Sequence, residues 1–184
     1  MRIIGGKYRG KKLFSPASDN VRPTSDRARE ALFNILNSTL EKPLSEYTFL
    51  DVFSGTGAIA LEALSRGAAQ VGLIDINPKN LQKNTALFPL EKDKIKVIKA
   101  DVAHLPQASE QYDLLFMDAP YQKGLSEIAL LALDQQDWLV AGTLCMVEVE
   151  KTEQINVPAC YRVLNERMYG LAKIIFMTYE PSKK

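Results

Sequence analysis

The feature that most constrains this chain is an apolar stretch, Tyr47–Phe53, that leads into a Gly-x-Gly loop formed by Gly55 and Gly57. An apolar helical pattern begins at Ala58, directly after the second glycine. A strand that turns this tightly into a helix presents free backbone N–H groups, and the positive end of the helix, to whatever lies above it. The sequence therefore predicts an α/β unit whose loop forms the floor of a nucleotide site.

The loop alone fits more than one nucleotide. Gly55 to Ala60 satisfies the G-x-G-x-x-G/A pattern of dinucleotide sites, and Asp75 follows Gly57 at about the distance of a ribose-binding acid. Asp51 argues against a dinucleotide, because a carboxylate just before the loop would repel the pyrophosphate. It suits the amino group and sulfonium of S-adenosylmethionine (SAM). The sequence favours SAM, and the alternatives are NAD or a glycine turn kept only for packing.

Apolar strands alternate with helical patterns from Tyr47 onward, which indicates a parallel sheet with helices on both faces. After Tyr47–Phe53, the predicted parallel strands are Gln70–Asp75, Ile95–Ala100, Tyr112–Met117 and Thr143–Val149. Helices are predicted after Thr24-Ser25-Asp26, from Ala58, from Asn77-Pro78 and over Leu125–Asp134. The segments Tyr161–Asn165 and Leu171–Tyr179 are too close together for a crossover helix, so they are predicted to form an antiparallel pair.

Four aspartates, Asp51, Asp75, Asp101 and Asp118, each end a predicted strand. Because the carboxyl ends of parallel strands open onto one crevice, these side chains are expected to share a rim. Asp75 offers two acceptor oxygens for the ribose hydroxyls, and Asp101 with Val102 is expected to hold the adenine. The alternative for each aspartate is a cap on the following helix.

The segment Asp118-Ala119-Pro120-Tyr121 resembles the (Asp/Asn/Ser)-Pro-Pro-(Tyr/Phe) signature of methyltransferases that modify exocyclic amino nitrogens of nucleobases. Such an amine must move toward tetrahedral geometry before it can attack a methyl group. A carboxylate oxygen and a backbone carbonyl that accept its two N–H bonds favour that geometry, and Tyr121 is placed to stack on an extruded base. The alternative, a tight turn, explains Pro120 but not the acid or the aromatic ring.

Basic charge is concentrated at one end of the chain. Residues 1–29 hold eight basic and two acidic side chains, a net charge of +6, whereas the other 155 residues carry a net charge of −5. This asymmetry indicates an arm for a polyanion, with a solvated terminus as the alternative. The glycines around Gly5-Gly6 and Gly10 predict a small β-hairpin, in which Tyr8 either stacks on a base or packs against the partner strand.

The remaining composition sets limits on the class of protein. A chain of 184 residues with 46% hydrophobic content fits one catalytic domain with a sizeable core. It has no run of 18 apolar residues and no leader pattern, so we expect a cytoplasmic protein without a membrane partner. Cys145 and Cys160 lack metal-ligand spacing, and Cys145 is expected to be a buried free thiol. No metal site is expected, and His104 is interpreted as a surface or packing residue.

Five segments together resemble the RsmD family of bacterial 16S rRNA guanine-N2 methyltransferases. They are Arg2–Leu13, Arg22–Asn34, Asp51–Gly57, Leu61–Arg66 and Asp118–Tyr121, of which the first two are the most specific. The resemblance implies the class I SAM-methyltransferase fold, a Rossmann-like, mostly parallel sheet with an antiparallel C-terminal strand. It further implies a SAM cofactor, and one guanine of 16S rRNA in the small ribosomal subunit or an assembly intermediate as substrate. The chain departs from the family pattern at Ala119, Asp75 and Asn77.

With this resemblance the sequence predicts two parts, an N-terminal arm (residues 1–20) and a SAM-dependent methyltransferase domain (residues 21–184), in a monomeric protein. The predicted catalytic residues are Asp118, Ala119, Pro120 and Tyr121. The predicted cofactor-binding residues are Thr24, Asp51, Phe53, Ser54, Gly55, Gly57, Asp75, Ile76, Asp101, Val102 and Asp118. The predicted RNA-binding residues are Arg2, Lys7, Tyr8, Arg9, Lys11, Lys12, Arg22 and Arg27.

Three other functions remain as alternatives. A DNA adenine-N6 or cytosine-N4 methyltransferase would use the same chemistry, although no target-recognition insertion is evident. A non-enzymatic rRNA-binding assembly factor would retain the fold without the activity. An NAD-linked oxidoreductase is disfavoured by Asp51 and by the lack of a credible proton donor.

Overall fold

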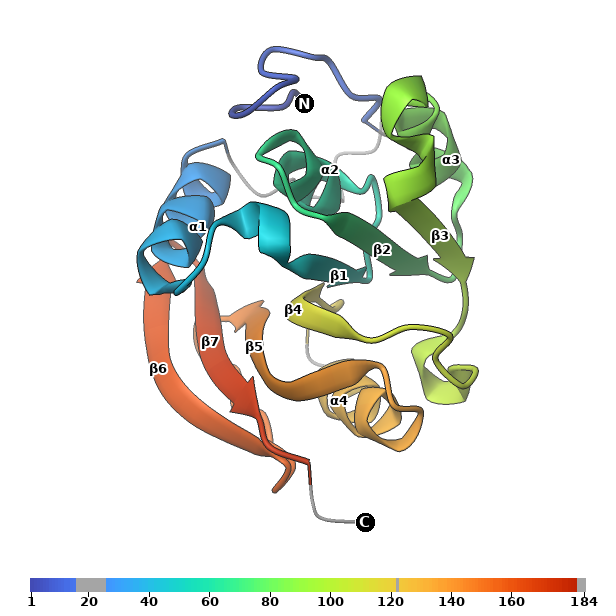
Figure 1. Cartoon of the computed structure of the whole chain (residues 1–184). Helices are drawn as coiled ribbons and strands as arrows, with labels where there is room; N and C mark the ends of the chain where they lie inside the picture. The colour runs from blue at the N-terminus through green and yellow to red at the C-terminus, as the bar shows by residue number, and fades with distance from the viewer. Residues whose placement is uncertain (16–25, 122, 182–184) are drawn as a thin grey trace.

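The computed structural model describes residues 1–15, 26–121 and 123–181. In this part of the chain the strands form a seven-stranded sheet with the order β3-β2-β1-β4-β5-β7-β6 (Figure 1). The strands are β1 (Thr48–Val52), β2 (Gln70–Asp75), β3 (Ile95–Lys99), β4 (Tyr112–Asp118), β5 (Leu139–Glu150), β6 (Tyr161–Tyr169) and β7 (Ala172–Tyr179). The five strands from β3 to β5 are parallel, and β7 runs antiparallel to both β5 and β6. The predicted mostly parallel sheet with an antiparallel C-terminal pair is confirmed.

Helices cover both faces of the sheet, because side chains along each strand alternate between two hydrophobic clusters. Phe49 lies in the cluster that contains the apolar residues of α1, α2 and α3, whereas Leu50 lies in the cluster that contains those of α4. The helices are α1 (Asp26–Thr39), α2 (Ala58–Ser65), α3 (Lys79–Thr85) and α4 (Leu125–Gln135), with short 3-10 turns η1 (Leu44–Glu46), η2 (Pro89–Lys94) and η3 (Val102–His104). Among the helices of the described ranges, none has the length and hydropathy of a membrane span.

Two strands extend beyond their predicted bounds. β5 begins at Leu139 instead of Thr143, and its pairing with β4 shifts register between Tyr112 and Leu114. β6 continues past Asn165 to Tyr169, because its backbone pairs with β7 although most of its side chains are exposed. An edge strand with exposed side chains does not require apolar residues at alternate positions. The strand predicted from the apolar pattern therefore ended at Asn165, before the strand itself does.

Of the N-terminal arm, residues 1–15 are described, and they form a hairpin-like loop closed by one antiparallel bridge between Arg2 and Lys12. The Ile3 amide donates to the Lys11 carbonyl over 2.9 Å. The loop lies against α2: a Cβ on Gly5 would come within 2.6 Å of the Arg66 guanidinium, and one on Gly6 would overlap the Ser65 carbonyl. The two glycines therefore allow the arm to approach α2 closely.

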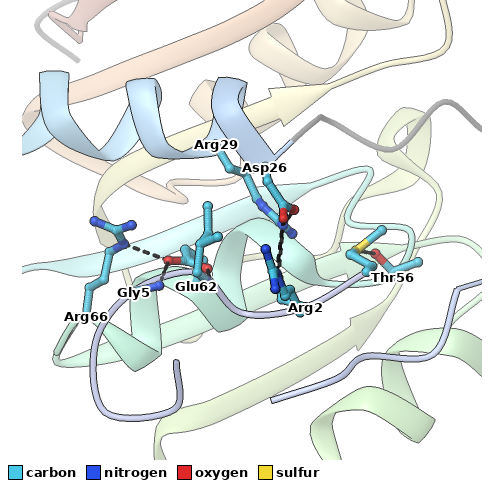
Figure 2. A network of polar contacts seen from close by, with 9 residues as sticks. Arg2, Gly5, Asp26, Arg29, Thr56, Glu62 and Arg66 are labelled. Atoms are coloured by element: carbon cyan, nitrogen blue, oxygen red, sulfur yellow. Dashed lines mark hydrogen bonds and ion pairs between the residues drawn. The ribbon is translucent and has the colours of Figure 1, made fainter. Parts of the chain in front are cut away.

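Buried contacts tie the arm to the domain. The carboxylate of Glu62, fully buried on α2, accepts the amides of Ile4 and Gly5 over 2.8 Å each, and the Arg66 guanidinium over 2.7 Å (Figure 2). Ile3 and Leu13 are buried in the same cluster as α1, α2 and α3. The division into an arm and a domain remains a prediction, since the two share one core.

Candidate functional site

A cleft of about 1000 Å³ opens at the carboxyl ends of the central strands. It lies where the strand order reverses between β1 and β4, the usual ligand position in an open α/β sheet. Among the described residues that line it, six are acidic: Asp51, Asp75, Asp101, Asp118, Glu148 and Glu150. Arg29 is the single basic side chain in that lining. The cleft therefore suits a ligand that carries positive charge.

The floor of the cleft is the loop between β1 and α2. Phe53, Gly55 and Gly57 all have positive φ angles, of 61°, 55° and 75°. A left-handed conformation is unusual for phenylalanine, and such strain is often held at functional sites. The Ser54 hydroxyl fastens the turn by donating to the carbonyls of Asp51 (2.5 Å) and Ile74 (3.1 Å). Phe53, Ser54 and Gly55 line the cleft.

Gly57 is absent from the described lining of the cleft. Its backbone begins α2, and a Cβ there would come within 2.8 Å of Leu73 Cδ2 and 2.9 Å of Leu81 Cδ2. The second glycine therefore allows α2 to pack close to β2 and α3.

Asp51 acts as a cap in addition to lining the cleft. Its Oδ2 accepts the Ala60 amide in the first turn of α2 over 3.2 Å, and the residue is 3% exposed. Burial raises the pKa of Asp51 well above its usual value, although the hydrogen bond from Ala60 opposes this effect. Its contact with a ligand cation remains a prediction.

Asp75 is fixed at the end of β2. Its Oδ2 accepts the Gly55 amide and its Oδ1 accepts the Asn77 amide, each over 2.8 Å. These bonds hold the carboxylate against the glycine loop. Each oxygen keeps a lone pair for a further donor, such as a ribose hydroxyl.

The far side of the cleft combines apolar and acidic groups. Ile76 lines it although 65% of its surface is exposed, and the neighbouring Val102 is buried. Asp101 Oδ1 accepts the Ala103 amide over 3.0 Å, so this aspartate also caps a turn. His104, with a side chain 85% exposed, lies 3.7 Å from Asp101, in agreement with its interpretation as a surface residue.

Asp118 differs from the other three aspartates. It ends β4 directly opposite Glu148 of β5, and no described residue donates a hydrogen bond to its carboxylate. Burial, followed by the charge of Glu148, raises the pKa of Asp118 to about 7. A half-buried carboxyl in a cleft, with a pKa raised close to neutrality and no described hydrogen-bond donor, is typical of a catalytic group.

Tyr121 lies beside this pair of acids. It is 41% exposed, and its hydroxyl donates to Glu148 Oε1 over 3.4 Å. Ala119 is buried and Pro120 is exposed, and both line the cleft. The structure thus brings all four predicted catalytic residues to one wall.

The sequence analysis missed three charged residues of the cleft: Arg29, Glu148 and Glu150. Glu148 and Glu150 alternate with valines in an apolar strand, so both acids lie on the same face of the strand. This pattern could have identified them as site residues from the sequence. Arg29 lies on the buried face of α1, where a basic side chain is unexpected.

The predicted RNA-binding residues fall into two groups. Lys7 and the Tyr8 hydroxyl hydrogen-bond Glu91 over 2.6 and 3.0 Å, and Lys11 donates to the Leu87 carbonyl over 2.7 Å. The bond from Lys7 lowers the pKa of Glu91 to about 2. The Tyr8 ring packs edge-on against Phe88, between α3 and η2, at 5.0 Å. It therefore packs, but against the domain and not against the partner strand of the hairpin.

The second group is exposed and consists of Arg2, Arg9, Lys12 and Arg27. Within this group Arg2 pairs with Asp26 over 3.3 Å (Figure 2). Arg22 and Thr24 lie outside the described residues.

Comparison with known proteins gives consistent results. The family model described as conserved hypothetical protein 95 matches residues 1–178. Ribosomal RNA small subunit methyltransferase D of Escherichia coli strain K12 is 37% identical over 175 residues, which cover 92% of this chain and 85% of that protein. The Haemophilus influenzae protein of the same name is 34% identical, covering 93% and 90%. A solved Escherichia coli structure, the candidate methyltransferase yhhF, has a TM-score of 0.82 at 33% identity and covers 99% of each chain.

Proposed function

Because this chain belongs to the RsmD family, the family described as conserved hypothetical protein 95, we propose that it transfers a methyl group from SAM to the exocyclic N2 of one guanine in 16S rRNA. The chain is a methyltransferase with the class I fold. The single observation that carries the proposed chemistry is Asp118, a half-buried carboxylate at the cleft wall to which no described residue donates a hydrogen bond.

The residues of the cleft fit SAM as the donor. SAM carries two cationic groups, an ammonium and a sulfonium, and the six acids of the lining match that charge. Asp75 would hold the ribose, while Ile76 and Val102 offer apolar surface to the adenine beside Asp101. When bound, SAM supplies a methyl group already activated by its sulfonium, so neither a metal nor a covalent nucleophile is required.

Asp118 positions the attacking amine. In its ionised form the carboxylate accepts one N–H of the guanine amine, and the Ala119 carbonyl accepts the other, so the nitrogen lone pair turns out of the ring plane. A new N–C bond replaces the S–C bond of the donor, and the amine releases one proton. With a pKa of about 7, Asp118 is suited to take up that proton. Tyr121 stacks on the base.

The RNA is bound by the exposed cations of the N-terminal arm and of the first turn of α1, namely Arg2, Arg9, Lys12 and Arg27. Of these, Arg2 and Lys12 line a small pocket together with Met1, which also lines the cleft. We expect the substrate to be the small ribosomal subunit, assembled or assembling, in the cytoplasm.

Methyl transfer from tritiated SAM tests the proposal. The purified chain is incubated with small ribosomal subunits, with free 16S rRNA and with duplex DNA, in parallel with Asp118→Ala. We expect label in 16S rRNA, either free or in the particle, and none in DNA or with the variant. Label in DNA alone would support a DNA methyltransferase, and binding of RNA without any label would support an assembly factor.

A further inference from the structure

Arg29 is the single basic side chain among the described residues that line the acidic cleft. It lies in the first turns of α1, its side chain is 1% exposed, and it lines the cleft. Its Nη2 donates to the Arg2 carbonyl over 2.9 Å and to Asp26 Oδ1 over 2.7 Å (Figure 2). Its Nε and Nη1 are buried and have no hydrogen-bond partner among the described residues.

Buried N–H groups without acceptors, such as those of Arg29, destabilise a protein that has no ligand bound. Buried N–H groups of an ion normally have acceptors, and each unmet one destabilises the folded state. An apolar side chain would fill the same volume without leaving donors unpaired. The unused Nε–H and the two Nη1–H bonds therefore indicate an acceptor that the described residues do not supply.

The charge of the lining restricts what that acceptor is. The six other Asp, Glu, Lys, Arg and His side chains in the described lining are all carboxylates, which suit the ammonium and sulfonium of the donor. The donor also carries one carboxylate, on its amino-acid end, and those six acids would repel it. Arg29 is the single cationic side chain available there to bind it.

The position of Arg29 in the fold also fits a contact with the donor carboxylate. The residues suited to the adenosine, Asp75, Ile76 and Asp101, follow β2 and β3 at one end of the sheet. Arg29 belongs to α1, which lies on the opposite side of α2 from α3 and β3 (Figure 1). A donor that extends from Asp101 across the glycine loop would bring its amino-acid end toward α1.

We propose that Arg29 binds the carboxylate of the methyl donor through its free Nε and Nη1 groups. This inference rests on the proposed function, because it names the residue that recognises the amino-acid end of SAM. Since Nη2 holds the Arg2 carbonyl, the same guanidinium also connects the donor site to the N-terminal arm.

Two ligands that differ only in the carboxylate isolate this contact. Calorimetry measures the binding of SAM and of decarboxylated SAM to the wild type, to Arg29→Gln and to Arg29→Lys. Lys83→Gln, which removes an exposed cation from α3, is the charge-matched control. We expect Arg29→Gln to bind SAM about 10- to 100-fold more weakly, as for loss of a charged hydrogen bond, with decarboxylated SAM unaffected or bound more tightly. Arg29→Lys should recover part of the loss, and Lys83→Gln should match the wild type.

The decarboxylated ligand also reports whether the variant cleft is intact. Equal weakening of both ligands by Arg29→Gln would show that Arg29 only holds the arm and α1 together, and would overturn the inference. Unchanged SAM affinity would overturn it as well. If the wild type bound neither ligand, the proposed function itself would fail.

Discussion

At the scale of single residues, Asp118 links function to a loss of stability. The folded state raises the pKa of its carboxyl from an ordinary value near 3.8 to about 7. Between these two pH values the unfolded chain has released the proton and the folded chain has kept it. Folding stability therefore falls as the pH rises from about 4 to about 7.

Asp118→Asn removes this ionisation and nearly preserves the shape of the side chain. We expect the variant to be more stable than the wild type at pH 8, by on the order of 1–4 kcal/mol, and about equally stable at pH 4. Denaturant unfolding of both proteins from pH 4 to pH 8 measures this difference. The variant should also lose methyl transfer while keeping its SAM affinity within a few fold. A stability difference independent of pH would show that Asp118 is ionised at little cost.

The same ionisation determines the pH dependence of turnover. Only the carboxylate form of Asp118 accepts the amine N–H, so turnover should rise with pH through about 7. Glu148→Gln removes the neighbouring negative charge that helps to raise this pKa, so its profile should shift to lower pH. Steady-state rates from pH 5 to pH 9 provide the comparison, and identical profiles for the two proteins would exclude this electrostatic coupling.

Local patterns in the sequence predicted part of the cleft. Asp51, Asp75 and Asp118 were found because each follows an apolar strand, and parallel strands bring their carboxyl ends together. Glu148 was missed because its importance comes from pairing across strands with Asp118, a register that the sequence does not specify. Arg29 was missed because only the folded core shows that its donors lack acceptors.

At the scale of elements, the structure separates two kinds of cation in the N-terminal arm. Lys7, although exposed, is bound to Glu91, and Lys11 is bound to the Leu87 carbonyl, whereas no described residue binds the exposed side chains of Arg9 and Lys12. Composition alone assigned all four to RNA, because it cannot show which cations the protein already uses.

Arg9→Ala with Lys12→Ala should therefore weaken RNA binding without lowering thermal stability. Each phosphate contact releases counterions, so the slope of log K against log salt should become shallower by about 1.4 to 1.8 for two lost contacts. Filter binding of 16S rRNA over a series of salt concentrations measures the slope. Lys83→Gln is the control, and an unchanged slope in the double variant would place the RNA contact elsewhere.

At the scale of the whole molecule, the sequence predicted the class of fold but not how the N-terminal arm packs against the rest of the chain. Strand and helix alternation gave the parallel sheet, because buried strands and amphipathic helices have different periods. The sequence did not show that the N-terminal arm is part of the main core. Ile3 and Leu13 pack in the same cluster as α2 and α3, and a contact between segments so far apart in the sequence leaves no local pattern.

Deletion of residues 1–14 tests how independent the arm is. The deletion exposes the surface that Ile3 and Leu13 cover and removes two donors from the buried Glu62 carboxylate. We expect a loss of at least about 3 kcal/mol in the free energy of unfolding, measured by chemical denaturation. A truncated protein as stable as the full chain would show that the arm is a separate unit.

The central claim is that one guanine amine is methylated at the wall formed by Asp118 and Tyr121. Mass spectrometry of nucleosides from 16S rRNA, after incubation of small subunits with SAM and the purified chain, tests it most directly. The account predicts one N2-methylguanosine per rRNA with the wild type and none with Asp118→Ala. A methyl group on another nucleoside, or undiminished N2-methylguanosine from the variant, would contradict it.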